Sequence, residues 1–373
     1  MKHSLFLMIL LLSLSCTSRS QAKRDSIIDT LSDSLSATDS ISPTDTLRLL
    51  FVGDLMQHQG QINAARTSTG YDYSTCFTYV KEEIGRADLA IANLEVTLGG
   101  KPYKGYPAFS APDEFLTAIH DAGFNVLVTA NNHSLDRGKS GLERTIQLID
   151  SLKIPHAGTY INTEERDKKY PLLLEKNGFR IALLNYTYGT NGIPVTPPNI
   201  VNYIDTTVIA KDIEESKAMK PDAIIACMHW GIEYQSLPSK KQKFLADWLL
   251  QKGVDHVIGS HPHVVQPIEV REDSLTKEKH LVVYSLGNYI SNMSARRTDG
   301  GLMVRMELVK DSTIRLNHCE YSLVWTARPI QSGKKNHQLL PINLPSDSIP
   351  VNARNSLRIF TNDARTHFNK HNQ

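Results

Sequence analysis

The sequence predicts an α/β protein in which buried strands alternate with amphipathic helices. Short apolar runs rich in β-branched residues recur along the chain, and they cover 49–52, 89–92, 126–128, 181–184, 223–226, 256–258 and 281–284. Such runs are typical of strands that are covered on both faces. Segments with helical spacing of apolar residues lie between several of these runs, and this alternation is typical of α/β folds.

Three of the expected helices carry their own signals. Ser110 is expected to cap the first of them, with Pro112 in its first turn. The second is expected over 141–149. The third is expected over 240–252, with an apolar stripe that includes Phe244 and a glycine stop directly after it.

The C-terminal part of the chain has a different pattern. Residues 302–325 predict two or three further strands without helices between them. Residues 331–373 are polar, and they are expected to form a C-terminal extension with one possible helix over 353–368. The main domain is therefore expected to span 47–330.

Composition and charge exclude several classes of protein. The 373 residues include 41 Lys and Arg against 39 Asp and Glu, so the near-zero balance argues against a protein that binds nucleic acid through its phosphates. With 40% apolar and 21% charged residues the chain is an ordinary globular protein rather than a disordered one. Four Cys in so long a chain are too few for a disulfide scaffold.

The N-terminus predicts export. Residues 1–15 combine a short basic start with an apolar stretch, which is typical of a signal peptide and too short for a membrane-spanning helix. Cys16 follows directly and resembles the lipidated Cys of a bacterial lipoprotein box, although Ser13 departs from the usual pattern. The alternative is a plain signal peptide followed by a chance Cys. Residues 16–46, rich in Ser, Thr and Asp, are then expected to be a flexible tether.

Polar side chains follow six of the apolar runs at the point where each run ends. They are Asp54, Asn93 to Glu95, Asn131 to His133, His229, His261 with His263, and Asn288. In an open α/β sheet, binding sites form at the carboxyl ends of the strands. These residues, although distant in sequence, are therefore expected to lie close together.

The expected cluster contains carboxylates, amides and imidazoles but no thiolate, and this donor set suits Mn²⁺, Fe²⁺ or Zn²⁺. Residues two apart in extended backbone point the same way, so His261 and His263 are expected to face one site. So many ligands exceed what one tetrahedral zinc ion takes from a protein. They fit a site with two metal ions.

The ordered motifs resemble those of a known family. Phe51 to Asp54, Asn93 to Glu95, Ala130 to Gly138, His229 to Gly231, Gly259 to His263 and Tyr284 to Tyr289 resemble the blocks of the capsule-synthesis CapA proteins. That family is linked to poly-γ-glutamate capsules and belongs to the calcineurin-like metallophosphoesterase superfamily. The resemblance covers roughly 47–295 and implies a four-layer α/β/β/α sandwich with a dinuclear site between the two sheets.

Roles are carried over from the family motif by motif. The residues that resemble metal ligands are Asp54, Glu95, Asn132, His229, His261 and His263. His133 resembles the imidazole that protonates the leaving group or stabilises the transition state. Asp136 is expected to orient His133 from the second shell of the site.

One position departs from the wider superfamily. The first strand of that superfamily carries Asp-x-His, whereas this chain has Met56 at the His position. Either one ion loses a ligand or His58 replaces it. Asn288 is a further residue that we consider for contact with metal or substrate.

Each motif also has an ordinary structural explanation. Asp54 alone is compatible with a turn residue, and His229 alone with a buried core imidazole. Because all such explanations would have to hold together at six strand ends, we favour the metal site. The loop with Lys101, Tyr103, Lys104 and Tyr106 is either a solvated loop or a substrate lid.

The sequence therefore predicts a metal-dependent hydrolase at the cell envelope, on the periplasmic face or the cell surface. Its expected substrate is a phosphoester or the γ-glutamyl bond of an anionic polymer. The alternative is a non-catalytic, metal-containing component that binds or exports polymer. Contact with the membrane is expected through the lipid anchor only, with no nucleic acid as a partner, and no protein partner is indicated.

Overall fold

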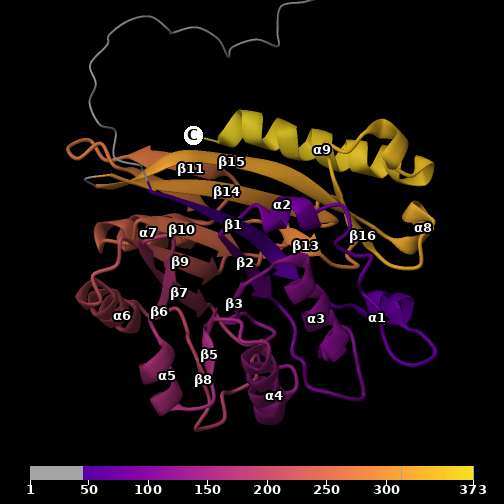
Figure 1. Ribbon diagram of the computed structural model, residues 1–373, viewed down its shortest axis with the longest axis horizontal. Coiled ribbons are helices and arrows are strands. Elements are labelled where there is room, and N and C mark those ends of the chain that lie inside the picture. Colours follow the sequence, from indigo (N-terminus) through magenta and orange to yellow (C-terminus); the bar gives the residue numbers. More distant parts are fainter. Residues whose placement is uncertain (1–44, 312, 373) are drawn as a thin grey trace, which may run out of the picture. The chain divides into compact units, whose positions relative to one another are not determined.

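Two β-sheets that pack face to face form the centre of the structure (Figure 1). The computed structural model describes residues 45–311 and 313–372, which belong to one compact unit, Pro43–Gln373. The predicted signal, Cys16 and almost all of the predicted tether lie outside the described residues. The exceptions are Asp45 and Thr46, which already belong to the first strand, β1 (Asp45–Leu55).

The first sheet has eight strands, and β1 lies at its middle. Its order is β16 (Gln338–Pro341), β15 (Ile314–Ala327), β14 (Gly300–Lys310), β1, β2 (Leu89–Leu94), β3 (Val126–Val128) and β4 (His156–Ala157), with β13 (Asn288–Ile290) also paired to β1. The pairs from β1 to β4 are parallel, and those from β1 to β16 are antiparallel. The carboxyl ends of β1, β2 and β3 therefore meet at one edge of the sheet.

The second sheet has six strands, with parallel strands at its centre. Its order is β11 (Ile268–Glu272), β12 (Lys279–Val283), β10 (His256–Ser260), β9 (Ala223–His229), β7 (Phe179–Thr187) and β6 (Leu172–Lys176). Strands β12, β10, β9 and β7 run parallel to one another. A separate pair joins β5 (Thr159–Tyr160) to β8 (Ile200–Val201). All seven strands predicted from the apolar runs are confirmed.

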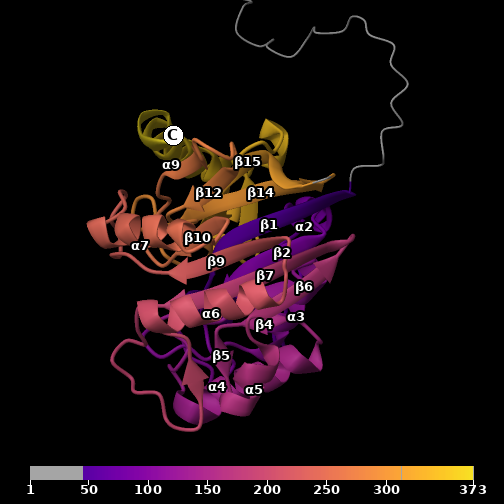
Figure 2. The ribbon, with the colours of Figure 1, turned by 90° about the vertical axis from the view of Figure 1, so that its left-hand side faces the viewer.

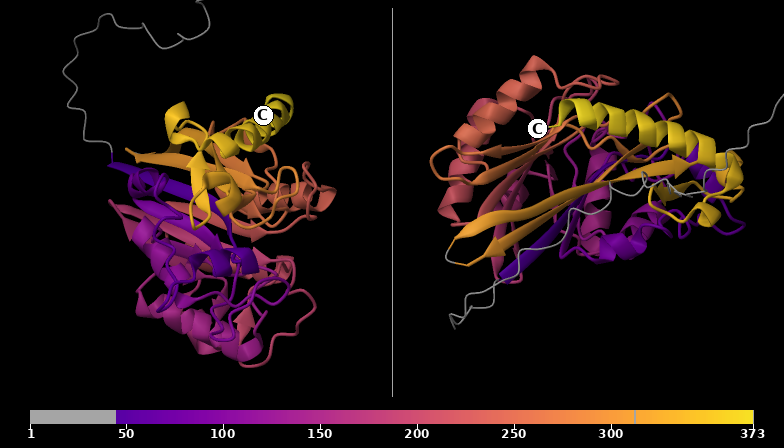
Figure 3. Two further views of the ribbon diagram at one scale, coloured as in Figure 1. Left: turned by 90° about the vertical axis from the view of Figure 1, so that its right-hand side faces the viewer. Right: turned by 90° about the horizontal axis from the view of Figure 1, so that it is seen from above.

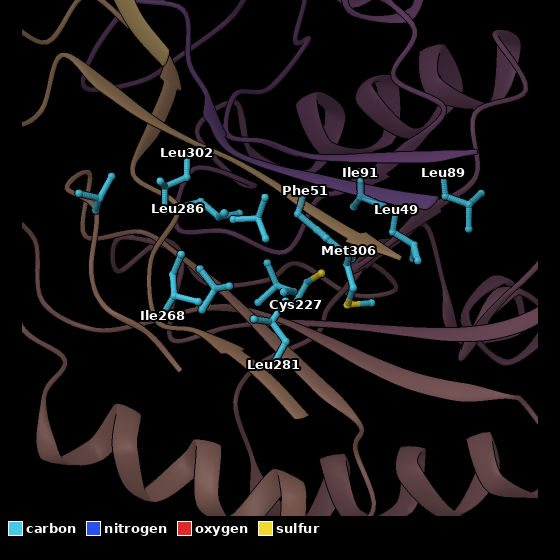
Figure 4. Close-up of a cluster of buried hydrophobic side chains, with 14 of the residues drawn as sticks. Leu49, Phe51, Leu89, Ile91, Cys227, Ile268, Leu281, Leu286, Leu302 and Met306 are labelled. Atoms are coloured by element: carbon cyan, nitrogen blue, oxygen red, sulfur yellow. The ribbon is translucent and has the colours of Figure 1, made fainter. Parts of the chain in front are cut away.

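Alternate residues of β1 explain how the layers stack. Leu49 and Phe51 point to the other sheet and pack with Cys227 and Leu281 in the central core (Figure 4). Leu50, between them, belongs instead to a cluster on the outer face of the first sheet. This alternation is the two-residue period of a strand.

Helices cover both outer faces. The first sheet is covered by α2 (Lys81–Gly85), α3 (Asp113–Ala122) and α4 (Gly138–Ser151). The second is covered by α6 (Thr206–Ala218) and α7 (Lys240–Gln251), which lie in front of it in Figure 2. The remaining short helices are α1 (Gln59–Ala65), α5 (Thr163–Lys169), α8 (Pro329–Ser332) and a 3₁₀ turn at Ser346–Ser348. The expected α/β/β/α layer order is confirmed.

Two local predictions about the helices were wrong. Pro112, not Ser110, precedes the first turn of α3. The Ser110 hydroxyl donates instead to the carbonyl oxygen of Gly100 at 2.7 Å, so that it closes the loop before the helix. On α7, Phe244 is 60% exposed although it was assigned to the apolar stripe.

The polar C-terminal residues are part of this architecture. Strand β16 extends the first sheet, and α9 (Val351–His371) runs along the long strands β14 and β15 (Figure 3). Leu357, Phe360 and Phe368 of α9 pack into the central core. Within the described residues no helix is long and apolar enough to cross a lipid bilayer.

A β-bulge at Gly53 interrupts β1 just before its end. Val52 pairs with Ala92 but Asp54 already pairs with Asn93, so β1 has one residue more than β2 at this point. A bulge of this kind turns the following side chain to the other face of the sheet. Asp54 therefore does not join the outer apolar layer to which Val52 belongs.

Replacing Gly53 with Ala should destabilise the fold by about 1–3 kcal/mol, the usual cost of overpacking a core. The added Cβ would lie 1.9 Å from the carbonyl oxygen of Gly287, where two backbones cross. Gly189→Ala is the matched control, because nothing lies within 4 Å of a Cβ there. Urea unfolding measures the difference, and equal stability of the two variants would contradict the prediction.

Candidate metal centre

Strand pairing brings the predicted residues together at one edge. Asp54 lies opposite Asn93 of β2 and opposite Asn288 of β13. In the second sheet, His229 at the end of β9 lies opposite Ser260 at the end of β10. The site thus forms where the carboxyl ends of parallel strands from both sheets meet, as the sequence predicted.

Asp54 and Glu95 form a pair of buried carboxylates. Both residues are completely buried. The Asn93 amide lies between them, since its Nδ2 is 2.8 Å from Asp54 Oδ1 and 3.3 Å from Glu95 Oε2. The other oxygens, Asp54 Oδ2 and Glu95 Oε1, have no hydrogen-bond partner. One donor atom each from Asp54, Glu95 and His229 lies within 4.8 Å of the others, a spacing that suits a metal ion.

The imidazole of His229 approaches the carboxylates from the second sheet. Its Nε2 lies 3.7 Å from Glu95 Oε1 and 2.8 Å from the amide oxygen of Asn132. Its Nδ1 lies 3.0 Å from the hydroxyl oxygen of Ser260. Asn132, predicted as the amide ligand, thus lies against the His229 ring.

His263 and His261 complete the cluster. His263 Nδ1 is 3.2 Å from Asp54 Oδ2, and its Nε2 is 4.0 Å from Glu95 Oε1. The ring of His261 lies 4.8 Å from that of His229, and its buried Nδ1 has no hydrogen-bond partner.

The two histidines are brought together by a backbone that differs from the prediction. We expected extended backbone, but His261 has φ 100° and His263 has φ 59°. Positive φ is uncommon outside glycine and concentrates at functional sites. The turn at Pro262, rather than strand alternation, thus directs both imidazoles to the site.

Burial and mutual contact shift the pKa values in the cluster. Burial alone would raise the pKa of Asp54, but the contact with His263 brings it below its usual value. Burial and the charge of Asp54 raise the pKa of Glu95. Burial and the neighbouring imidazoles lower the pKa of His229, and they lower that of His261 to about 3. Both imidazoles are therefore neutral at pH 7, the form that binds metal.

The pKa of His263 responds differently. Burial lowers it, but contact with Asp54 outweighs this and raises the pKa above the ordinary value. His263 and Asp54 thus favour each other's charged forms in this arrangement.

His133 and Asp136 form a separate pair beside the cluster. His133 Nδ1 is 2.7 Å from Asp136 Oδ2, and both side chains are buried. The backbone N–H of Phe109 donates to the same oxygen at 2.8 Å, and the Phe109 ring lies 4.6 Å from the imidazole. Asp136 thus joins the His133 ring to the backbone at Phe109.

Three further predicted positions have defined surroundings. Met56 packs in the outer apolar cluster and offers no ligand. The Nδ1 atom of His58 lies 3.4 Å from the backbone nitrogen of Asn292, and its ring packs on Phe109. Asn288 accepts a hydrogen bond from His263 Nδ1 at 2.9 Å and positions that ring.

Sequence reasoning missed several contributors. Asn93 was noted at a strand end but given no role, although its amide contacts both carboxylates and lies 3.3 Å from His229 Nδ1. Tyr188 was not considered, yet its ring lies 4.4 Å from that of His261. Its position directly after β7 was the available signal, because β7 is one of the parallel strands.

Comparisons with known proteins agree with these motifs. The family described as "Bacterial capsule synthesis protein PGA_cap" matches residues 48–293. The chain is 28% identical over 298 residues to the capsule biosynthesis protein CapA of Bacillus anthracis, in an alignment that covers 75% of this chain and 69% of that protein. It is 29% identical over 280 residues to the PGA biosynthesis protein CapA of Bacillus subtilis, in an alignment that covers 73% of this chain and 70% of that protein.

Among solved structures, the calcineurin-like phosphoesterase YfkN of Bacillus subtilis is similar at 13% identity and a TM-score of 0.47, over 87% of this chain and all of that one. So distant a similarity says nothing about activity. The family match extends over more than half of the chain and contains every residue of the metal centre. The chain therefore belongs to the bacterial capsule synthesis protein family PGA_cap.

Proposed function

We propose that the protein is a divalent-metal-dependent hydrolase that acts on a phosphoester or a γ-glutamyl bond of a capsule or surface polymer. The observation that carries this proposal is the buried carboxylate pair, Asp54 and Glu95, which faces three imidazoles and has on each carboxylate one oxygen without a hydrogen bond. Membership of a capsule synthesis family supports the polymer context.

The residues present fit divalent ions. Buried polar atoms in proteins are almost always hydrogen-bonded, so buried atoms without a hydrogen bond on Asp54, Glu95 and His261 in one cluster fit a bound cation. The oxygen and nitrogen donors suit Mn²⁺, Fe²⁺ or Zn²⁺. Asp54, Glu95, Asn132, His229, His261 and His263 would hold the ions, and Glu95 lies between the Asp54 and His229 sides of the set. When bound, such ions supply Lewis-acid chemistry and bring the pKa of water to about 7.

The His133–Asp136 pair supplies the remaining chemistry. The Asp136 carboxylate contacts the Nδ1 atom of the ring at 2.7 Å, which orients the imidazole and leaves its Nε2 atom for the substrate. His133 can then give a proton to the oxygen or nitrogen that leaves, as a general acid. A metal site with a purely structural role has no use for such a pair, so its presence favours the enzyme over the non-catalytic alternative.

Export and lipidation at Cys16 stay predictions of the sequence, since these residues lie outside the described part. They agree with a role at the cell envelope. The predicted tether, residues 16–46, would connect an anchored Cys16 to the domain that starts with β1.

Elemental analysis of the purified protein, as isolated and after incubation with Mn²⁺, Fe²⁺ or Zn²⁺, should find close to two ions per chain. The double variant His261→Ala with His263→Ala should lose most of this metal, because both imidazoles leave the donor set. His318→Ala, an exposed histidine on β15, is the matched control. One ion in the wild type would indicate that Met56 disables one position, and none would refute the hydrolase.

His133→Asn should lower kcat by about 10²- to 10⁴-fold, the usual contribution of a general acid. The loss should be large for an alkyl phosphodiester and much smaller for a p-nitrophenyl phosphodiester, whose leaving group needs no proton. The kcat of Asp136→Asn should lie between those of wild type and His133→Asn, and both variants should keep their metal. The role as acid is wrong if His133→Asn slows the two substrates equally.

Glu95→Gln should stabilise the metal-free protein at pH 7 but not near pH 4. The folded-state pKa of Glu95 lies above the unfolded value, so its contribution to stability is present at low pH and is lost as pH rises. Gln cannot ionise and avoids this loss. Thermal unfolding with a chelator at both pH values measures the effect, with the exposed Glu164→Gln on α5 as control. A gain of equal size at both pH values would contradict the prediction.

A further inference from the structure

The segment between β13 and β14 contacts the candidate metal centre through the side chain of Asn288. The Nδ2 atom of Asn288 donates to the carbonyl oxygen of Thr298 at 2.8 Å. Its Oδ1 atom faces His263 Nδ1 at 2.9 Å. An amide has its donor on one side and its acceptor on the other. The Thr298 carbonyl therefore determines which side of the Asn288 amide faces the His263 ring.

The orientation of this amide has a consequence for His263. Two acceptors lie at the Nδ1 atom of the ring, Asn288 Oδ1 at 2.9 Å and Asp54 Oδ2 at 3.2 Å. An acceptor at one ring nitrogen places the proton there and leaves the other nitrogen to bind a metal ion. The Nε2 atom, 4.0 Å from Glu95 Oε1, is thus the atom that His263 offers to an ion. A rotated amide would bring its NH₂ group to Nδ1 and oppose this arrangement.

The Thr298 carbonyl belongs to a turn that the C-terminal helix holds. The backbone N–H and the hydroxyl of Thr298 both donate to Ala295 O, at 3.0 and 2.8 Å. Within this turn, Arg296 donates two hydrogen bonds to the Asp363 carboxylate of α9, at 2.6 and 2.7 Å. Arg297 lies 3.8 Å from the same carboxylate. Two parallel hydrogen bonds from one guanidinium fix a direction as well as a distance, so Asp363 defines where the turn lies.

The attachment of α9 to the domain does not depend on this contact. Leu357, Phe360 and Phe368 pack into the central core and hold the helix there. The Arg296 side chain is 70% exposed, and ion pairs at the surface contribute little to the stability of a fold. The contact between Arg296 and Asp363 is therefore weak as a source of stability but specific in placing the turn.

The residues of this contact lie outside the segment that matches the family. The match ends at residue 293, whereas Arg296, Thr298 and Asp363 follow it in the chain. The family motifs therefore do not describe this part of the surroundings of His263.

We propose that Asp363 is a positioning residue of the candidate metal centre. It holds the turn at Thr298 through Arg296. The Thr298 carbonyl orients the Asn288 amide, which presents Nε2 of His263 to a metal ion. The inference rests on the proposed function and adds the C-terminal helix to the elements that build its site.

The test is the metal affinity of the purified protein, measured by competition with a chelator for Zn²⁺ and for Mn²⁺. Asn288→Ala should raise the Kd of the metal about 10- to 100-fold, the usual loss when a direct partner of a metal ligand is removed. Asp363→Asn acts through that partner and should raise the Kd about three- to tenfold. The double variant should bind metal no more weakly than Asn288→Ala alone, because both changes act on one path.

Asp247→Asn on α7 is the matched control, because it removes a contact of the same kind, 2.7 Å from Arg271, on the outer side of the second sheet. Its metal affinity should equal that of wild type, and the Tm of the metal-free protein should be similar for Asp247→Asn and Asp363→Asn. A purely structural role of Asp363 would lower this Tm and would not depend on Asn288.

The proposal is overturned if Asp363→Asn binds metal like Asp247→Asn, if its loss adds in full to that of Asn288→Ala, or if it lowers the Tm far more than the control does. These outcomes leave the hydrolase standing. A wild type that takes up no metal would refute the hydrolase and this proposal together, so the two failures are distinguishable.

Discussion

The site depends on two carboxylates of like charge that are buried next to each other. Asp54 and Glu95 are both completely shielded from solvent. Burying a charge costs several kcal/mol even after relaxation, and a second negative charge nearby adds to that cost. The Asn93 amide and His263 offset part of it, but one oxygen on each carboxylate keeps no hydrogen bond. A cluster with more acceptors than donors favours added positive charge, either as protons on Glu95 and His263 or as a bound cation.

The carboxylates can meet only because β1 departs from regular strand geometry. Along a regular strand, Asp54 would point to the same side as Leu50 and Val52, into the apolar layer under α3. The bulge at Gly53 turns it away from that layer, and the close approach of Gly287 leaves no space for a side chain at the bulge. Backbone irregularity at one residue thus decides the position of the acid at the centre of the site.

The sequence predicted the strands and the identity of the clustered residues, because both depend on local patterns. Apolar runs mark buried strands, and polar residues at their ends converge wherever the strands are parallel. The bulge at Gly53 could not be predicted, since it exists only relative to the pairing of β2. The positive φ of His261 could not be predicted either. The backbone there is not extended as expected, but both imidazoles still face the site. The role of Asn93 required knowledge of three partners that lie far apart in sequence.

The two sheets contribute different chemistry to the site. The first sheet and its loops supply the oxygen donors, Asp54, Glu95 and Asn132, whereas the second supplies the imidazoles, His229, His261 and His263. Neither sheet has a complete set, and the first sheet carries Met56 at the position where the resemblance led us to expect an imidazole. The donor set therefore exists only when the sheets pack, and the apolar core between them fixes the distances across the site. The core and the candidate metal centre are two regions of a single interface, so a substitution that shifts one sheet against the other changes the distances in the site without replacing any of its residues.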